Sequence, residues 1–385
     1  MKNILFVVDE KKMGGVSVLL SDILNKISLK NKQIDIMILH NSGNYLDDLP
    51  KNINIIYGTK FFEVVDLSFK EVIKSKKISL IYKKIKLILM MKTGIIKSKI
   101  IKERKKCIQK RYDVEVAFKD GFCAIFTAYG DSKKKYHWLH TDYSMYDCTE
   151  NYKNLFIDVF SKFDNIIGIS ESVVKKFREK YDYKKTKVIY NLINEKKIID
   201  KSKEFKVSNP KNKINFISVG RFHNMKGYDR LVDVFARLKN EKKLDNVSLR
   251  LIGDGPDFNL VKNKIEENNL QDYINLEGLK KNPFPYVKAS DVFLMCSRYE
   301  PFGLVILEAM ILKVPVISCE VASINEIMDK KYGMIVENNE EGLYEGIKKI
   351  IENKSIIKKY QNELTNYKYP VNNIIKEIER LLEKE

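Results

Sequence analysis

The stretch Ser297–Pro315, SRYEPFGLVILEAMILKVP, is the most informative segment of the chain. It follows the apolar run DVFLMC at 291–296, which predicts a buried strand, and it opens a helix near Phe302. Short β-branched-rich runs alternate with longer amphipathic stretches over nearly the whole chain, from Asn3–Asp9 to Met334–Val336. This alternation is typical of parallel sheets covered by helices, so the predicted class is α/β.

Two domains are expected, because 385 residues exceed the ~250–300 that one hydrophobic core usually reaches. The charged stretch Asn194–Lys213 is the best candidate for a linker. We predict an N-terminal Rossmann-like domain at 1–195, a C-terminal one at 196–365, and a final helix at 366–385 that packs back on the first domain. Two doubly wound domains would face a cleft at the carboxyl ends of both sheets, where ligands bind.

The turn between the strand and the helix of the opening stretch has the features of a phosphate site. Gly303 lets a ligand approach the backbone, and the N–H groups of Gly303, Leu304 and Val305 at the helix N-terminus suit an anion. Glu300 ends the strand and Glu308 lies about two turns into the helix, so they suit hydroxyls on either side of a diphosphate. The alternative is a capped helix whose Glu308 is merely solvated.

Two cations follow an earlier strand, in FISVGRFHNMKGYD at 216–229. Arg221 and Lys226 lie on a predicted strand-to-helix loop, where a planar guanidinium and an ammonium suit a diphosphate. Ordinary surface charge is the alternative. It fits Arg221 poorly, because only nine of the 70 basic residues are arginines.

The first half of the chain offers a glycine pair and a strand-end histidine. Gly14 and Gly15 follow the first strand and suit phosphate or sugar, although a plain turn explains them equally well. The loop is not GxGxxG, which disfavours a nicotinamide cofactor. His140 closes the strand of YHWLHTD at 136–142, beside Asp142, and suits hydroxyl binding or acid–base work. A half-buried structural histidine is the alternative, and a core position is favoured for His137.

The net charge of +19 is concentrated in one segment. Lys70–Arg111 holds sixteen basic and two acidic residues, a balance of +14 in 42 residues, with isoleucines at helical spacing on both sides of Thr93–Gly94. This pattern favours an anionic membrane surface as partner. Nucleic acid is disfavoured, because only Tyr82 and the adjoining Tyr112 are available to stack on bases.

Metal and disulfide chemistry are not expected. The four histidines form no HxxxH or HExxH pattern, and the five cysteines are scattered without metal or redox spacing. The apolar run Leu87–Met91 is far shorter than the ~20 residues of a membrane span, and MKNILFVVDE lacks the length and cleavage site of a signal peptide. A reduced cytosolic location follows.

Taken in order, these motifs resemble those of the retaining glycosyltransferases of family 4, which have the GT-B fold. The resemblance is strongest over Ile214–Val336, in VGRFHNMKGYDRL, LIGDGP, NLEGL, SRYEPFGLVILEAMILKVP, NEIM and YGMIV. It implies a nucleotide-diphosphate sugar donor, retention at the anomeric carbon, and no required metal or other cofactor. The run Leu279–Asp291 is similar to members that build bacterial surface glycans, which implies a saccharide or lipid-linked saccharide acceptor at the inner face of the cell membrane.

The resemblance also implies roles for single residues. Glu300 would contact the donor sugar and His140 would face the reacting centre, which makes these two the predicted catalytic residues. Gly14 and Asp142 would lie on the acceptor side. The implied donor-binding residues are Gly15, Arg221, Lys226, Phe302, Gly303, Leu304, Val305 and Glu308. The chain departs from the family at Glu320–Glu326, where many members carry a Gly-Gly pair, so the role of that loop is open.

Two other functions stay open on the residues alone. A GT-B-like sugar-nucleotide epimerase would share the sheets but would not need the Glu300–Glu308 element together with Arg221 and Lys226. A non-catalytic GT-B partner protein would be expected to lose these donor-site residues, and all four are present. Measuring nucleotide release with and without acceptor separates a transferase from an epimerase.

Overall fold

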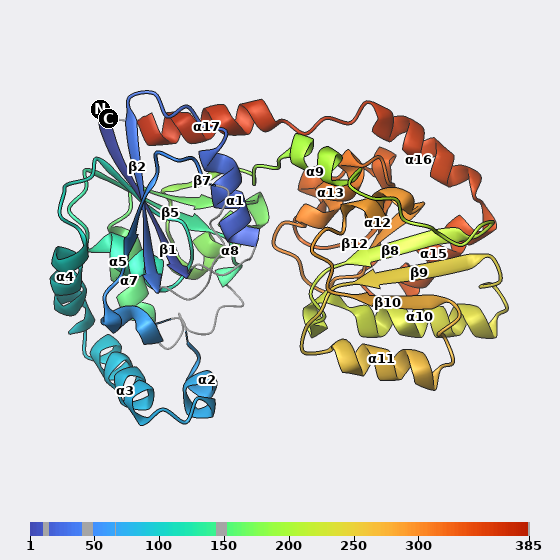
Figure 1. Cartoon of the computed structure of the whole chain (residues 1–385), viewed down its shortest axis with the longest axis horizontal. Coiled ribbons are helices and arrows are strands. Elements are labelled where there is room, and N and C mark those ends of the chain that lie inside the picture. The colour runs from blue at the N-terminus through green and yellow to red at the C-terminus, as the bar shows by residue number, and fades with distance from the viewer. Residues whose placement is uncertain (11–14, 41–48, 66, 144–151, 384–385) are drawn as a thin grey trace. The chain divides into compact units, whose positions relative to one another are not determined.

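The computed structural model describes residues 1–10, 15–40, 49–65, 67–143 and 152–383. It divides the chain into two compact units, each built on one parallel sheet (Figure 1). Unit 1 comprises residues 1–192 and 371–385, and unit 2 comprises residues 193–370. The predicted class, two Rossmann-like α/β domains, is confirmed.

Unit 1 has a seven-stranded sheet in the order β3-β2-β1-β4-β5-β6-β7. Every neighbouring pair is parallel, which explains why its central strands read as continuous apolar runs. The strands are β1 Lys2–Glu10, β2 Lys32–His40, β3 Asn54–Tyr57, β4 Val114–Ala117, β5 Lys134–Leu139, β6 Asn165–Gly168 and β7 Thr186–Val188.

Helices flank this sheet on both sides, with α4, α5 and α7 on one side and α1 and α8 on the other (Figure 1). They are α1 Gly15–Leu24, α2 Phe69–Lys74, α3 Ile78–Lys92, α4 Ile96–Cys107, α5 Phe122–Ala128, α7 Lys153–Ser161 and α8 Glu171–Tyr181, with a short 3-10 helix, η1, at Lys60–Val64. Gly94, at φ +75°, separates α3 from α4 at the break that the sequence predicts.

The helix α17, Val371–Glu383, belongs to unit 1 although it follows unit 2 in the chain. Its strongly amphipathic sequence buries Ile374, Ile378, Leu381 and Leu382. Polar contacts add to this packing: the Glu379 carboxylate accepts a hydrogen bond from the Ser28 N–H at 2.7 Å, and Glu383 pairs with Lys32 at 2.7 Å.

Unit 2 has a six-stranded sheet in the order β10-β9-β8-β11-β12-β13. Its strands are β8 Ile214–Val219, β9 Val247–Ile252, β10 Ile274–Gly278, β11 Val292–Met295, β12 Val316–Cys319 and β13 Gly333–Val336. Its helices are α9 Glu195–Lys201, α10 Tyr228–Asn240, α11 Phe258–Glu267, α12 Phe284–Ala289, α13 Leu304–Ile311, α14 Ile324–Ile327, α15 Glu340–Glu352 and α16 Ser355–Thr365, with 3-10 helices η3 Asn224–Lys226 and η4 Lys330–Tyr332.

The chain passes from unit 1 to unit 2 between Leu192 and Ile193, just ahead of the predicted linker. The first part of the predicted linker forms the helix α9, which its polar sequence did not indicate. Asn194 caps the helix, because its side chain accepts a hydrogen bond from the Lys197 N–H at 3.1 Å, and Ile198 is 5% exposed.

The strand order of each sheet reverses beside its first strand. The reversal lies between β1 and β4 in unit 1, and between β8 and β11 in unit 2. At such a switch point the loops after the two strands run to opposite sides and leave room for a ligand at the carboxyl edge. The loops that follow these four strands are therefore the places to look for a site.

Candidate functional site

Both predicted donor-site segments lie at the switch point of unit 2. The loop after β8 carries Arg221 and Lys226, and the loop after β11 carries Glu300 and Gly303. The Lys226 ammonium forms an ion pair with the Glu300 carboxylate, so the two loops touch through opposite charges. Arg221, by contrast, is exposed and has no hydrogen bond or ion pair with any described residue.

Gly303 caps the N-terminus of α13 in a left-handed conformation, at φ +88°. A side chain there would be strained, and an added Cβ would lie 3.3 Å from Cδ1 of Ile327. Leu304 and Val305 start the helix, so their N–H groups have no acceptor within it and point their partial positive charge ahead of the helix. The neighbouring Phe302 is buried, at 2% exposed.

The Glu308 side chain lies on the second turn of α13 and is half-buried. Burial raises the pKa of this carboxyl to about 7, and it has no hydrogen bond or ion pair with a described residue. A desolvated carboxyl without a hydrogen-bond partner among the described residues is stabilised by a ligand that donates hydrogen bonds to it.

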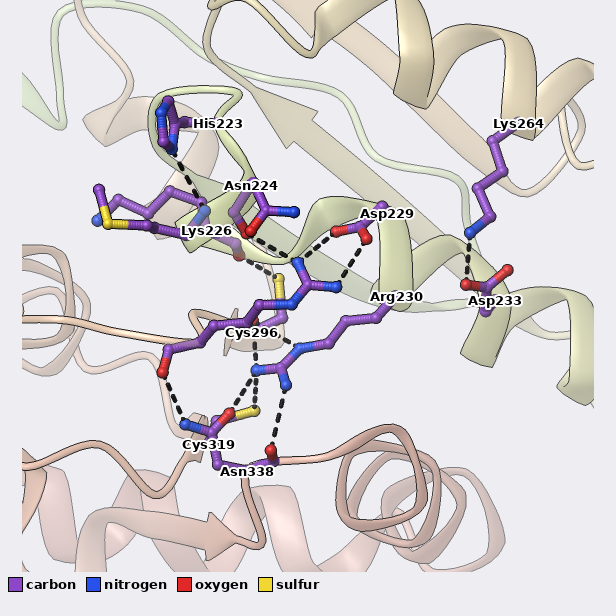
Figure 2. A network of polar contacts seen from close by, with 12 residues as sticks. His223, Asn224, Lys226, Asp229, Arg230, Asp233, Lys264, Cys296, Cys319 and Asn338 are labelled. Atoms are coloured by element: carbon purple, nitrogen blue, oxygen red, sulfur yellow. Dashed lines mark hydrogen bonds and ion pairs between the residues drawn. The ribbon is translucent and has the colours of Figure 1, made fainter.

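A network of polar contacts, which includes the buried Arg230, holds the two loops together (Figure 2). Arg230 of α10 is 4% exposed, and its guanidinium donates to the Cys296 carbonyl at 2.8 Å and to Oδ1 of Asn338 at 2.7 Å. The Cys296 thiol in turn donates to the Lys226 carbonyl at 3.1 Å. The end of β11, the turn before α10 and the segment after β13 are thereby tied together.

A second arginine completes this network. Both terminal nitrogens of Arg298 bind the Asp229 carboxylate, each at 2.7 Å, and Nη1 also donates to the Asn224 carbonyl at 2.7 Å. Gly227 lets the two loops approach this closely, because it adopts φ +70° and an added Cβ would lie 2.1 Å from the Cys296 carbonyl oxygen.

The sequence reasoning missed Arg230 and Arg298. The scarcity of arginine, which already marked Arg221, was a signal that would have singled them out.

The segment Glu320–Glu326, which departs from the family pattern, contacts the backbone of the turn that carries Glu300. Ser323 is completely buried, and its hydroxyl lies 3.2 Å from the carbonyl oxygens of both Glu300 and Phe302. Ile327, at the end of the short helix α14, places its Cδ1 where it would crowd any side chain added at position 303. Here the loop therefore holds the backbone that carries Glu300.

In unit 1, His140 follows β5 at the carboxyl edge of the sheet. Its ring lies edge-on to Phe118, with centroids 5.0 Å apart, and Nε2 is buried without a hydrogen-bond partner among the described residues. Burial, together with the nearby His137, lowers the pKa of His140 to about 3. The imidazole is therefore neutral at physiological pH.

Next to His140 lies Asp120, which sequence reasoning did not find. It follows β4 at the switch point, in the dipeptide Asp120–Gly121, a turn signal that the sequence displays. Oδ2 accepts a hydrogen bond from the His140 N–H at 3.2 Å, whereas Oδ1 is buried without a hydrogen-bond partner among the described residues. Burial raises the pKa of Asp120 to about 7.

The remaining predicted residues of unit 1 lie in varied places. Gly15 starts α1 and is exposed, whereas Gly14 lies outside the described residues. Asp142 is completely buried and pairs with Lys176 of α8 at 2.5 Å, which fixes the turn after β5 and leaves the carboxylate inside the unit. His137 is a core residue, as predicted, because it is fully buried and stacks on Phe160 with centroids 5.7 Å apart.

Across residues 1–10, 15–40, 49–65, 67–143 and 152–383, no group of three His, Cys, Asp or Glu side chains is placed to hold a metal ion. Within the same ranges, every helix is too short or too polar to cross a bilayer.

Solved structures with the same architecture identify the fold. Anabaena HepE, in complex with UDP and glucose, aligns over 99% of both chains with 17% identity and a TM-score of 0.70. A glycosyltransferase from Rickettsia africae aligns over 100% of this chain and 99% of its own, with 21% identity and a TM-score of 0.67. The fold is GT-B. Residues 200–370, nearly all of unit 2 of this GT-B chain, match the family model of glycosyl transferases group 1.

Curated relatives match a part of the GT-B chain. An uncharacterized glycosyltransferase of Methanocaldococcus jannaschii is 30% identical over 58% of this chain and 64% of its own. The N-acetylgalactosamine-N,N'-diacetylbacillosaminyl-diphospho-undecaprenol 4-alpha-N-acetylgalactosaminyltransferase of Campylobacter jejuni is 29% identical over 52% of this chain and 53% of its own. The chain thus spans between 53% and 64% of the length of these relatives.

Proposed function

We propose that the protein is a retaining glycosyltransferase of family 4. It transfers a sugar from a nucleotide-diphosphate donor to a saccharide acceptor. The observation that carries this proposal is the charge arrangement at the switch point of unit 2. The Arg221 guanidinium, which has no partner among the described residues, lies at the same sheet edge as the Lys226–Glu300 ion pair and the N-terminus of α13.

The Lys226–Glu300 ion pair suggests how the donor enters. A diphosphate competes for the Lys226 ammonium with more negative charge than one carboxylate offers, and Arg221 is ready to bind it as a planar fork. When Lys226 turns to the diphosphate, Glu300 loses its partner and becomes an acceptor for sugar hydroxyls. Glu308, whose carboxyl has no polar partner among the described residues, takes the ribose hydroxyls.

In the transfer step the bond from the anomeric carbon to the β-phosphate oxygen breaks, and the acceptor hydroxyl oxygen bonds to that carbon. The acceptor proton passes to the departing diphosphate, because the lowered pKa of His140 makes its imidazole a poor base. His140 instead orients a hydroxyl of the sugar, and Asp120 holds the backbone of His140 in place.

We extend the proposal to the acceptor and the location. The Campylobacter relative is named for a diphospho-undecaprenol-linked acceptor, which supports a lipid-linked saccharide here too. Such an acceptor requires the enzyme at the cytoplasmic face of a membrane, with Lys70–Arg111 contacting anionic lipid. The product would then serve surface glycan synthesis.

A panel of nucleotide sugars, screened by thermal shift and then by nucleotide release with and without saccharide acceptor, tests the function. Arg221→Ala and Glu308→Gln should each weaken donor binding about tenfold or more, since charge-assisted contacts contribute roughly 1.5–3 kcal/mol. Lys211→Ala and Glu267→Gln, at exposed positions of the same unit, serve as matched controls. Unchanged donor affinity in both test variants contradicts the donor site, and release that ignores the acceptor contradicts transfer.

A further inference from the structure

The helices α2 and α3 expose apolar side chains that an ordinary surface helix would bury. On α3, Ile78, Tyr82, Ile85 and Leu89 are 81%, 65%, 44% and 56% exposed. Their spacing of four, three and four residues places them on one face of the helix, as a stripe about 16 Å long. On α2, Ile73 is 52% exposed. We call the four α3 side chains the apolar stripe.

The opposite side of α3 is attached to unit 1 through contacts that fix how the helix is rotated. Lys83 pairs with Glu63 of η1 at 2.7 Å, and the Lys84 ammonium donates to the Val64 carbonyl at 2.9 Å. Leu87, on the same side, is 2% exposed. The stripe therefore faces solvent because η1 binds the other side of the helix.

The charged residues around the apolar stripe indicate which kind of partner surface it binds. Many cations of Lys70–Arg111 are already neutralised within unit 1: Arg104 pairs with the buried Glu115 at 2.8 Å, and Lys110 pairs with Asp35 at 2.9 Å. The lysines on α2, on the turn after it and on α3 differ. Six are exposed and form no ion pair with a described residue, namely Lys70, Lys74, Lys76, Lys77, Lys86 and Lys92.

We infer that the apolar stripe inserts into the headgroup region of an anionic bilayer while these six lysines contact the lipid phosphates. Apolar side chains suit the acyl-chain boundary of such a bilayer, and lysines without an ion-pair partner among the described residues suit its anionic headgroups. A second copy of the chain fits poorly, because two such faces would bring like charges together. Nucleic acid would leave the stripe in water. The inference rests on the proposed membrane location for its purpose, but its physical basis is independent of the transfer reaction.

The position of the stripe suits a lipid-linked acceptor. The helices α2 and α3 lie beyond the carboxyl edge of the unit 1 sheet, at the end of this unit remote from its N-terminus (Figure 1). His140 follows β5 at the same edge. A sugar held at the bilayer surface would thus approach unit 1 from the side on which the predicted catalytic histidine lies.

The decisive experiment uses the full chain and vesicles of phosphatidylcholine, with and without phosphatidylglycerol. In co-sedimentation, the double variant Ile78→Gln with Leu89→Gln should lower partition onto anionic vesicles about tenfold or more, because each side chain loses part of its apolar transfer energy. The matched control, Leu260→Gln with Leu279→Gln, alters two residues of unit 2 that are 55% and 76% exposed and should change nothing.

Insertion itself has a separate readout. The single tryptophan of the chain, Trp138, is 1% exposed, so Tyr82→Trp adds a reporter over a buried background. Its emission should shift to the blue on anionic vesicles, and brominated lipid should quench it.

Several outcomes would overturn the inference. These are equal binding to neutral and anionic vesicles, no effect of the double variant, or a dimer in solution that the double variant dissociates. Vesicle binding without sugar transfer to any soluble or lipid-linked saccharide would refute the proposed function and leave the inferred membrane surface intact. Transfer to a soluble acceptor without vesicle binding would do the reverse.

Discussion

The carboxyl edges of the two sheets are built from opposite kinds of polar group. The edge of unit 2 carries charges near the surface: an exposed Arg221 and the Lys226–Glu300 pair, whose side chains are 29% and 12% exposed. The edge of unit 1 carries the half-buried His140 and the buried Asp120, whose pKa values both favour the neutral form, and each has a buried polar atom without a hydrogen-bond partner among the described residues. Charged groups near water suit an anionic donor, whereas neutral groups in a low dielectric suit oriented hydroxyls.

The largest effect is expected when the support of the unit 2 edge is removed. Arg230→Ala leaves the buried Cys296 carbonyl without its donor, so we expect the unfolding free energy of unit 2 to fall by about 2–4 kcal/mol. Denaturation followed by circular dichroism measures this loss.

Arg237→Ala is the matched control on the same helix, because Arg237 is 46% exposed and pairs with Glu341 at the surface. Its loss should cost far less stability than the loss of Arg230, because water screens an exposed ion pair. Equal losses in the two variants would show that the buried network does not stabilise the edge.

A smaller effect should distinguish the unit 1 edge by its pH dependence. Burial raises the pKa of Asp120 from 3.8 to about 7, so the folded state favours the protonated carboxyl. Its contribution to stability is complete below pH 4 and is lost as the pH rises through 7. Relative to Asp120→Asn, the wild type should therefore lose about 1–3 kcal/mol of unfolding free energy between pH 4 and pH 8.

Urea titrations at four pH values measure this difference. Asp131→Asn, an exposed carboxyl of the same unit, is the control. Parallel stability curves for the wild type and Asp120→Asn would mean that Asp120 is charged in the folded state, and the two edges would then be alike.

Removal of divalent metal ions should have no effect on the transfer rate. If Arg221, Lys226 and the start of α13 neutralise the donor diphosphate, EDTA should leave the transfer rate unchanged to within about twofold. Activity that EDTA abolishes and Mg²⁺ or Mn²⁺ restores would contradict a donor edge that relies on protein cations alone.

The sequence predicted the sheets well because buried parallel strands leave a direct signal, continuous apolar runs such as Ile214–Val219. It predicted less about α3, because the same isoleucine spacing fits a helix that faces either way. In the structure Ile85 and Leu89 are exposed, and Lys83 and Lys84 face inward, a result decided by η1, which the pattern of α3 does not encode.

The candidate site shows the same limit. Arg221 and Glu308 were found because each fits a local motif, whereas Arg230 acts through Cys296 and Asn338, which are distant in sequence. Asp120 was missed because its importance comes from the strand order that brings β4 beside β1 and β5. Contacts that depend on topology leave little trace in a single sequence.

The return of α17 to unit 1 also sets an order of events during synthesis. Residues 1–192 leave the ribosome first, but the helix that buries Ile374, Ile378, Leu381 and Leu382 against them emerges only after all of unit 2 has been made. During that interval the apolar surface of unit 1 that α17 later covers stays exposed, so chaperones or other chains can bind it. Unit 2 is continuous in sequence and needs no such wait, so the second unit to be translated can be the first to finish folding.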